Sequence, residues 1–409
     1  MENKKYAVLR KKKKRRRARR LRRMLLTIEC VLIAVLSATL FVSAKFRKID
    51  FQKLGPTSVN DISEAAMRTL NGYTNIALFG IDNRSNGNFD SGQSDVIMVC
   101  SINNDTKEIR LASIYRDTIM DVDGSGKYRK CNYAYAHGGA KEAIDMLNRN
   151  LDLDIDDFVA VDFRAVTEAV DAVGGIDLGI TEDELNPPGH HPGINAYIEE
   201  VADVTGKKAH SIQGPGPLHA DGVQATAYCR LRYTASMDFG RAARQRIVLQ
   251  KLFAAVHSAS PKELGCLVDS LFPCISTSFS PANLLQLAGA VKDYTIAGTT
   301  GYPFKKSTAT PSNTIGSVVV PCDAASNVSE LHKWLFTESG TGISSEKDEA
   351  EASSAISDSE RSSIVNDSDV SSTVKRISSD IEEITGLTAE DAVDFDPVYE
   401  DASGDSVSK

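Results

Sequence analysis

The sequence predicts an α/β fold in which helices cover both faces of a sheet, and two observations carry this prediction. From about residue 73 onward, short apolar runs rich in β-branched residues alternate with longer segments that repeat apolar residues at helical spacing. Continuous apolar runs are typical of strands that are buried on both faces, as in a sheet between two helical layers. The stretch from 73 to 337 is long enough for one large domain.

The expected elements follow from these runs. Strands are expected at 75–81, 95–103, 109–114 and 158–163, and helices at 138–151, 164–174 and 240–259. The stretch 184–198 is rich in Pro and Gly, which predicts a long irregular loop. Residues 45–72 are expected to be a linker or a first helix.

The N-terminus predicts a membrane anchor. Residues 1–23 contain fourteen Lys or Arg, and residues 24–44 are apolar except for Glu29 and small hydroxyls. As a helix, 24–44 would extend about 30 Å, the thickness of a hydrocarbon core. Because basic flanks stay in the cytoplasm, we expect a single-pass protein of the cytoplasmic membrane with its N-terminus inside and its main domain outside.

Two alternatives accompany that interpretation. A cleaved signal peptide is conceivable because "VSA" before Lys45 resembles a small-residue cleavage site, but the apolar stretch is longer than a usual signal core. The basic run 1–23 is expected to bind anionic membrane lipids. A nucleic-acid-binding arm is the less favoured reading, so no nucleic-acid partner is expected.

The C-terminal segment 338–409 differs in composition from the domain. It contains nineteen acidic residues against five basic ones, many Ser, and only Phe395 and Tyr399 as aromatic residues. Such a segment buries too little apolar surface to offset its ordering entropy. We therefore expect a disordered acidic tail with at most a transient helix near 374–384, and deletion of residues 340–409 should leave folding nearly unchanged.

Cysteine usage limits the metal and redox chemistry. The chain has seven cysteines and no CxxC motif, which argues against a structural zinc site. Cys266 and Cys274, with Cys322, are the plausible disulfide partners, and the disulfide state of these three residues is left open.

Charged residues gather where predicted strands end or begin. They are Asp82 and Arg84, Asp95, and Arg116 and Asp117, and the stretch "CRLRYTASMDFGRAARQR" (229–246) adds five arginines to a chain of net charge −8. Because sites in α/β sheets lie beyond the carboxyl ends of strands, these groups could converge. Two Asp that hold Mg²⁺ beside bidentate guanidiniums form a typical pyrophosphate site. Weak surface ion pairs that close loops are the alternative.

Five segments carry a resemblance to the LytR-CpsA-Psr family. They are "FGIDNR", "SDVIMVCSINNDTKEIRLASIYRDT", "CNYAYAHGGAKEAIDMLNRNL", "VDFRAVTEAVDAVGGIDL" and "YCRLRYTASMDFGRAARQ". Their order and spacing follow the family densely over about 75–255. The resemblance implies an α/β/α sandwich with a central mixed sheet over 73–337, and a long apolar pocket for a prenyl chain.

The resemblance also implies a function. Members of this family lie at the outer face of the cytoplasmic membrane of mainly Gram-positive bacteria. They transfer an anionic glycopolymer, such as teichoic acid or capsule, from a polyprenyl-pyrophosphate carrier to peptidoglycan. Which polymer this chain would transfer is not indicated by its sequence.

Residue roles are implied in the same way. Asp82 and Asp95 match the metal-associated aspartates, Arg116 the "RD" arginine, Arg230 and Arg232 the "RxR" pair, and Asp238, Arg241, Arg244 and Gln245 the "DxxRxxRQ" signature. The chain departs from the family at Gln93, where many members have an arginine. Arg84 could supply the missing charge toward the pyrophosphate.

The chemistry expected of such a site rests on positive charge. When a pyrophosphate linkage breaks, negative charge grows on the leaving phosphate, and fixed cations such as Mg²⁺ and arginine stabilise it. Asp82 or Asp95 could instead act as general base toward an acceptor hydroxyl, although we favour a role as metal ligands. Glycopolymer transfer, hydrolysis of polyprenyl pyrophosphate and non-enzymatic regulation remain open, and the intact charged motifs argue against the last.

Overall fold

The protein is described by a computed structural model that covers residues 43–82, 89, 92–234, 237–336 and 369–393. Residues up to Ile49 belong to a separate unit, of which 43–46 form a helical turn. All elements below belong to the second unit, which begins at Asp50.

A seven-stranded mixed sheet forms the centre, with the strand order β1-β10-β7-β2-β3-β4-β11. These strands are β1 (Asp50–Phe51), β10 (Ile275–Thr277), β7 (Asp157–Asp162), β2 (Tyr73–Asp82), β3 (Gln93–Asn103), β4 (Glu108–Ile114) and β11 (Thr295–Tyr302). β3 is antiparallel to β2 and β4, whereas β7 is parallel to β2 and β11 is parallel to β4. The start of β3 therefore lies at the same edge as the ends of β2, β4, β7 and β11, which we call the site edge.

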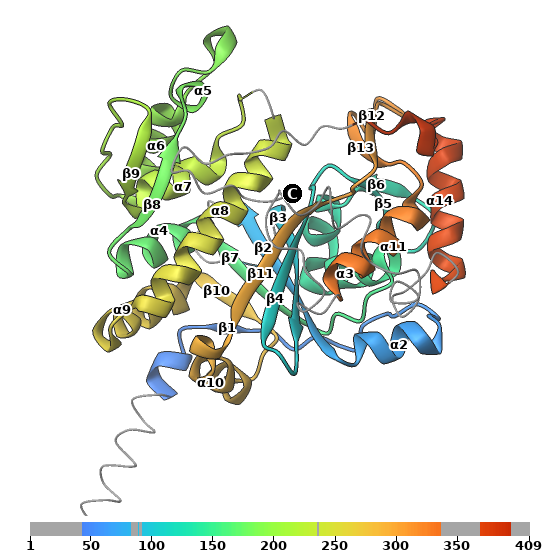
Figure 1. Ribbon diagram of the computed structural model, residues 1–409, viewed down its shortest axis with the longest axis horizontal. Helices are drawn as coiled ribbons and strands as arrows, with labels where there is room; N and C mark the ends of the chain where they lie inside the picture. Colours follow the sequence, from blue (N-terminus) through green and yellow to red (C-terminus); the bar gives the residue numbers. More distant parts are fainter. Residues whose placement is uncertain (1–42, 83–88, 90–91, 235–236, 337–368, 394–409) are drawn as a thin grey trace, which may run out of the picture. The chain divides into compact units, whose positions relative to one another are not determined.

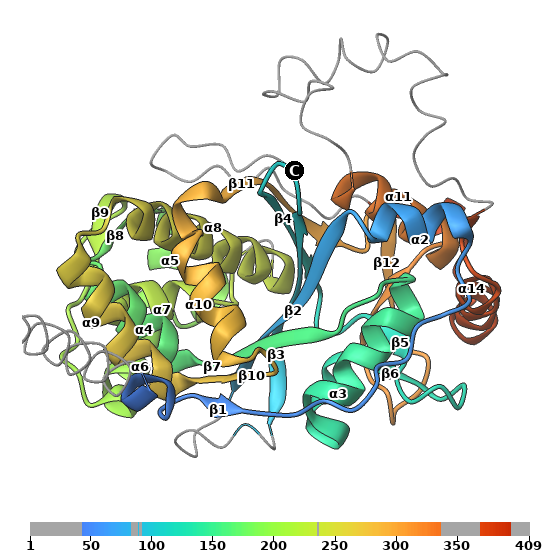
Figure 2. The ribbon, with the colours of Figure 1, turned by 90° about the horizontal axis from the view of Figure 1, so that it is seen from below.

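Helices cover both faces of this sheet (Figures 1 and 2). On one face α3 (Asn132–Leu151) and α11 (Ala324–Leu335) share an apolar cluster with Val99 of β3. On the other face α8 (Met237–Ser258) and α10 (Pro281–Gly289) pack against the next residue, Cys100. Successive side chains of a strand point to opposite faces, so β3 is buried from both sides. The predicted α/β fold with a central mixed sheet is confirmed.

A further apolar cluster lies beyond α8. It joins the helices α4 (Phe163–Ala172), α6 (Ile194–Thr205) and α7 (Gly222–Arg230) with the hairpin of β8 (Ile176–Ile180) and β9 (Gly216–Ala220). The domain also contains the helices α2 (Glu64–Leu70), α5 (Glu182–Leu185) and α9 (Pro261–Leu271). The segment 45–72 was expected to be a linker or a first helix, and α2 shows that it contains a helix.

The expectation of an irregular loop over 184–198 is only partly right. α6 begins at Ile194, and its residues Ile194, Ile198 and Val201 are fully buried. The spacing of these three residues is that of one helix face, but the preceding Pro and Gly obscured it. The seven elements expected elsewhere are present as β2, β3, β4, β7, α3, α4 and α8.

Two expectations about the termini and thiols meet different outcomes. Within the described residues no helix is both long and apolar enough to cross a membrane. The predicted span 24–44 lies outside these residues except for its last two positions. The six cysteines of the described part carry free thiols, so Cys266 and Cys274 are not joined in a disulfide.

The expectation of a disordered acidic tail is wrong for residues 369–393. They contain the helix α14 (Ser372–Thr385), whose Val374, Ile377 and Ile381 are almost completely buried. The average composition of 338–409 hid this apolar stripe, which has the spacing of one helix face. The parts 337–368 and 394–409 lie outside the described residues.

Packing of α14 reverses the expectation that the tail can be removed at no cost. Ile377→Ala should lower the free energy of unfolding by about 2–4 kcal/mol, because it leaves a cavity at a site that is 1% exposed. Thermal unfolding should then show a melting temperature lower by roughly 5 °C or more.

Ile384→Ala is the matched control, since Ile384 lies on the same helix and is 40% exposed. Equal melting temperatures for the two variants would show that α14 does not pack on the domain.

Candidate functional site

A β-bulge at the site edge directs Asp95. In the β2–β3 pairing Gly80 lies opposite Val96 and Ile81 opposite Ser94, so Asp95 is an extra residue without a cross-strand partner. Bulges of this kind turn a side chain away from the regular alternation and are frequent beside active sites. The tight pairing also requires Gly80, because a Cβ atom there would lie 2.7 Å from Cγ2 of Val96.

The turn after β4 presents Arg116 to this aspartate. Nη1 of Arg116 donates to Oδ1 of Asp95 at 2.6 Å, and its Nε lies 3.4 Å from Oδ2 of Asp117. Nζ of Lys130 lies 2.8 Å from Oδ1 of Asp117. The backbone N–H of Asn132 donates to the Arg116 carbonyl at 3.2 Å, which fixes the turn against the start of α3.

Two further arginines come from the segment around the start of α8. Nη2 of Arg232 lies 3.3 Å from Oδ2 of Asp95, so this one carboxylate bridges two guanidiniums. Arg241, on α8, pairs with Asp238 at 3.1 Å, and its side chain is only 5% exposed. Nη1 of Arg241 is buried and has no hydrogen-bond partner among the described residues. Buried donors are almost always paired in folded proteins, so this group is a candidate for contact with a ligand.

The charges of this cluster favour an anion. Burial lowers the pKa of Arg241 to about 10, and the opposing charge of Asp238 compensates only in part. Burial also disfavours charge on Arg116, but Asp95 and Asp117 outweigh it and raise the pKa of Arg116. Among the described side chains, four cations (Arg116, Lys130, Arg232 and Arg241) face three carboxylates (Asp95, Asp117 and Asp238). An anionic ligand would neutralise the remaining positive charge.

A cavity of about 330 Å³ opens beside the cluster. The charged part of its wall includes Asp95, Arg116, Asp117, Lys130, Asp238 and Arg241, and the apolar part includes Val96, Ile97, Ile114, Phe239, Ala242, Val318 and Val319. The buried hydroxyl of Ser113 also lines it and has no hydrogen-bond partner within the described part of the chain. The cavity thus offers an anion-binding end and an apolar surface to the same ligand.

Two of the predicted binding arginines take other positions. Arg230, at the end of α7, pairs with Glu200 of α6 at 3.0 Å. Arg244 is fully buried, donates to Oγ1 of Thr234 at 2.9 Å and lies 3.6 Å from Glu184. Neither arginine lines the cavity. Gln245 does line it, and its side-chain amide donates to a backbone carbonyl at 3.3 Å.

The remaining candidates lie at the ends of β2 and β3. Asp82 is the last residue of β2 and pairs through its backbone with Gln93, the exposed first residue of β3. Arg84 and the side chain of Asp82 lie outside the described part of the chain. Lys130 was not predicted, and no motif marks it, because only the pairing of two short strands brings it beside Asp117.

A magnesium ion fits the residues at this edge. Both oxygens of Asp95 accept from guanidiniums, but a carboxylate oxygen has a second lone pair and can also bind a cation. In the part of the chain that the structure describes, no group of three or more His, Cys, Asp or Glu could hold a metal. Mg²⁺ usually keeps several waters and binds one or two carboxylates together with substrate phosphates.

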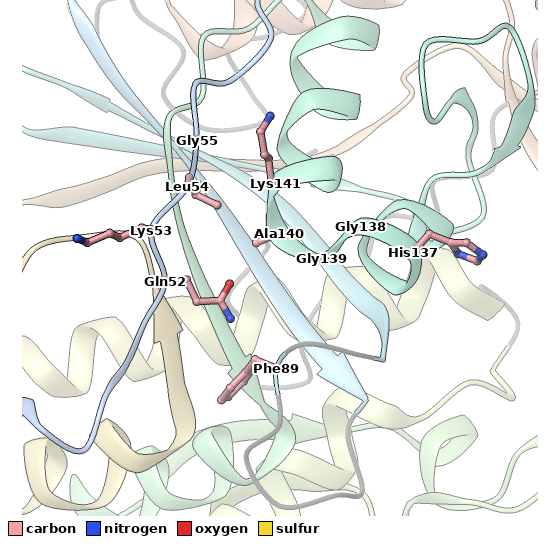
Figure 3. A pocket seen from close by; sticks show the side chains of 10 residues that line it. All are labelled: Gln52, Lys53, Leu54, Gly55, Phe89, His137, Gly138, Gly139, Ala140 and Lys141. Atoms are coloured by element: carbon pink, nitrogen blue, oxygen red, sulfur yellow. The ribbon is translucent and has the colours of Figure 1, made fainter.

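A second cavity, of about 300 Å³, lies where α3 is broken at Gly138 and Gly139 (Figure 3). Gly139 has φ 65°, which favours glycine at the break. Of the two lysines that line the cavity, Lys141 pairs with Asp145 at 2.6 Å, and Figure 3 shows Lys53 on the side opposite His137. This polar cavity lacks the convergent buried cations of the first one.

Comparison with known proteins places this geometry in context. The LytR_cpsA_psr family model matches residues 43–319. The chain is 33% identical over 184 residues to the polyisoprenyl-teichoic acid–peptidoglycan teichoic acid transferase TagU of Enterococcus faecalis, which covers 45% of this chain and 54% of that protein. It is 33% identical over 196 residues to biofilm regulatory protein A of Streptococcus mutans, covering 44% and 43%. The chain spans about half the length of the curated relatives that it matches.

Two solved structures share the fold. One is TagT bound to LI-WTA, with a TM-score of 0.51 and 21% identity over 70% of this chain and 97% of that one. The other is protein gbs0355 of Streptococcus agalactiae, with a TM-score of 0.53 and 22% identity over 73% and 99%. At these identities the likeness concerns the fold alone.

The burial of Arg241 predicts opposite effects on stability and binding. Because its folded-state pKa lies below the unfolded value, the charged guanidinium destabilises the empty protein at every pH below about 10. Arg241→Met keeps most of the shape and should raise the free energy of unfolding by about 1–3 kcal/mol at neutral pH.

The same variant should bind inorganic pyrophosphate at least about tenfold more weakly, because a charge-assisted hydrogen bond is lost. Calorimetry at pH 7 measures both quantities. A variant that loses stability but keeps wild-type affinity would show that Arg241 serves packing and not an anion.

Proposed function

The chain belongs to the LytR-CpsA-Psr family, and we propose that it transfers an anionic glycopolymer from a polyprenyl-pyrophosphate carrier to peptidoglycan. The transferase names of its relatives support this reaction class. We further propose that residues 24–44 anchor it in the cytoplasmic membrane with the catalytic domain outside, and that residues 1–23 contact anionic lipids.

One observation carries the proposal. Arg116 and the unsatisfied Nη1 of Arg241 lie at the charged part of a cavity that also has an apolar wall, and Arg232 contacts the same Asp95 from outside the cavity lining. A polyprenyl pyrophosphate has a matching division into a doubly phosphorylated head and a hydrocarbon chain. Guanidiniums bind phosphate oxygens in bidentate fashion, and the apolar wall would remove part of the chain from water.

The three arginines would bind the pyrophosphate and neutralise part of its negative charge. When the pyrophosphate enters, its oxygens replace Asp95 as acceptors for Arg116 and Arg232, and Arg241 gains the partner that it lacks. As the phosphoanhydride bond breaks, negative charge grows on the departing polyprenyl phosphate. Fixed guanidiniums in a partly dry site stabilise that charge without reorganisation.

The acceptor is a sugar hydroxyl of peptidoglycan in this proposal. Its oxygen forms a phosphodiester bond with the glycopolymer phosphate, polyprenyl phosphate leaves, and the hydroxyl proton passes to a carboxylate or to water. Bound Mg²⁺ would supply further positive charge to the phosphates, and Asp95 and Asp82 would hold it.

The other predicted residues would act around these three arginines. We propose that Gln245, Gln93 and Arg84 contact the edges of the pyrophosphate. Arg230 and Arg244, which pair with Glu200 and Glu184, would instead hold the arginine-bearing segment in place.

Transfer and hydrolysis differ in whether a sugar hydroxyl or water attacks the phosphate. The full-length protein in detergent, incubated with lipid-linked glycan and peptidoglycan oligomers, separates the two. Glycan bound covalently to the oligomers supports transfer, whereas free phosphorylated glycan alone shows a hydrolase. Absence of both products would favour a non-enzymatic regulator.

Arg116→Ala should lower turnover by about 100-fold or more, because its charge stabilises the leaving phosphate most strongly in the transition state. Arg116→Lys should restore little, since an ammonium cannot span two phosphate oxygens in a planar fork. Initial rates and the melting temperature are measured together. A folded Arg116→Ala variant with a rate near wild type would remove Arg116 from the chemistry.

Asp95→Asn should behave differently. It removes a ligand charge but keeps the shape, so its activity should fall and then recover in part when Mg²⁺ is raised. The rate is measured as a function of Mg²⁺ for Asp95→Asn and Arg116→Ala, and only the first should respond. Wild-type activity that persists in excess chelator would argue against a metal at this site.

A further inference from the structure

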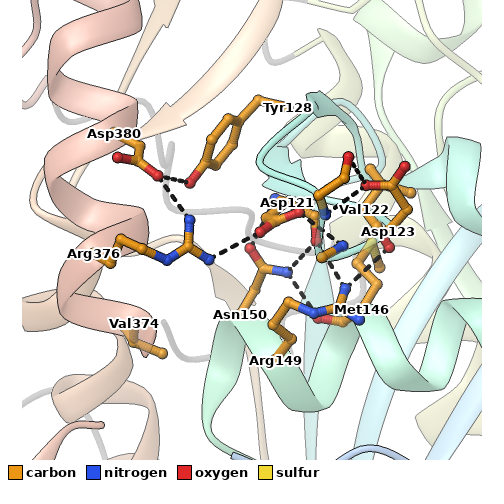
Figure 4. A network of polar contacts seen from close by, with 12 residues as sticks. Asp121, Val122, Asp123, Tyr128, Met146, Arg149, Asn150, Val374, Arg376 and Asp380 are labelled. Carbon is orange, nitrogen blue, oxygen red and sulfur yellow. Dashed lines mark hydrogen bonds and ion pairs between the residues drawn. The ribbon is translucent and has the colours of Figure 1, made fainter. Parts of the chain in front are cut away.

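The helix α14 holds a small hairpin next to the candidate site through polar contacts of two of its side chains (Figure 4). This hairpin consists of β5 (Ile119–Asp121) and β6 (Tyr128–Lys130), and Asp121 lies opposite Tyr128. Nη2 of Arg376 lies 3.1 Å from Oδ2 of Asp121. Nη1 of Arg376 lies 2.9 Å from Oδ2 of Asp380, which also accepts from the Tyr128 hydroxyl at 2.7 Å. Two residues of α14 thus hold both strands at one end of the hairpin.

The other end of the hairpin belongs to the arginine cluster. Lys130 lies opposite Ile119, and its ammonium reaches Asp117 at 2.8 Å. Asp117 in turn lies 3.4 Å from Nε of Arg116. Since a strand rises about 3.3 Å per residue, Tyr128 and Lys130 are only about 7 Å apart along β6. A displacement of the end that α14 holds would reach Lys130, because β6 is only three residues long.

Apolar packing reinforces the grip. Ile377 and Ile381 of α14 share a cluster with Ile119, Tyr128 and Val318. Val318 also lines the cavity of the candidate site. The helix therefore supports the cavity wall from behind as well as the hairpin.

The ion pair ties the position of α14 to that of the hairpin. Asp121 is fully buried, and its Oδ1 accepts from the backbone N–H of Gly124 at 2.9 Å while Oδ2 faces Arg376. The Arg376 side chain is 47% exposed, but its removal leaves the buried Asp121 carboxylate without this counter-charge in surroundings that solvate it poorly. The hairpin is thus expected to relax when Arg376 is absent.

We propose that α14 is a positioning element of the site, in which Arg376 acts through the β5–β6 hairpin and Lys130 to orient Asp117 and Arg116. This inference rests on the proposed function, because the ligand that reports it is a pyrophosphate. Arg376 touches no ligand in this account and works only through the hairpin.

The test uses the full-length protein and geranylgeranyl pyrophosphate as the probe, with binding measured by calorimetry. Arg376→Gln should weaken binding by about 3- to 10-fold. Glu383→Ala, an exposed position on the same helix, should bind like wild type. In a Lys130→Gln background, Arg376→Gln should cause no further loss of affinity, because the route to Arg116 is already cut.

Tyr128→Phe provides a second probe of the same grip, since it removes only the hydroxyl that donates to Asp380. Tyr128→Phe should also weaken binding of geranylgeranyl pyrophosphate. If Arg376→Gln does not fold, the affinity of Tyr128→Phe tests the positioning role of α14 in its place. Unchanged affinity in the folded variants would overturn the proposal. So would losses that add independently in the double variant, because a merely structural role of Arg376 would not depend on Lys130.

The control for the proposed function is the wild-type protein itself. If wild type does not bind the probe, the pyrophosphate assignment of the site fails. If wild type binds and Arg376→Gln binds equally well, only the positioning role of α14 fails.

Discussion

The bridge that Asp95 makes between Arg116 and Arg232 is the interaction on which the site depends. Guanidiniums brought together at a half-buried edge repel each other unless a carboxylate lies between them. The bulge in β3 places Asp95 there, and the close approach of Gly80 to Val96 permits the bulge. The bridge fixes both guanidiniums in place, and the phosphate that we propose as ligand would accept from the same donors.

The site is built at a cost to stability. The lowered pKa of Arg241 shows that its charge is disfavoured in the empty cavity, and its Nη1 has no partner among the described residues. Arg241 pairs with Asp238 and the buried Arg244 lies beside Glu184, yet burial lowers the pKa of both guanidiniums. What sets Arg241 apart is that its unpaired Nη1 lies beside the cavity, where we propose that a ligand binds, and the docked helix α14 supports the surrounding wall.

Much of the fold could be predicted from the sequence, because long apolar runs such as that of β3 record burial on both faces. Asp95 and Arg116 could be identified because they follow strand boundaries in motifs. Lys130 and Arg376 could not, since each meets its partner only through tertiary pairing. Arg230 and Arg244 share the motif of the cavity arginines, but which face of a helix or turn they occupy depends on packing. The helix near 374–384 was expected only as a transient one, because the acidic composition of the tail hid the apolar stripe by which α14 packs on the domain.

The central claim is that one ligand uses both the arginines and the apolar wall of the cavity. It is tested most directly by comparing the affinities of geranylgeranyl pyrophosphate, inorganic pyrophosphate and geranylgeraniol for the same protein by calorimetry. The account predicts that the complete amphiphile binds more tightly than either part, and that its affinity falls as salt is raised. Equal affinity for geranylgeraniol and geranylgeranyl pyrophosphate would contradict it, because the arginine cluster would then contribute nothing to recognition.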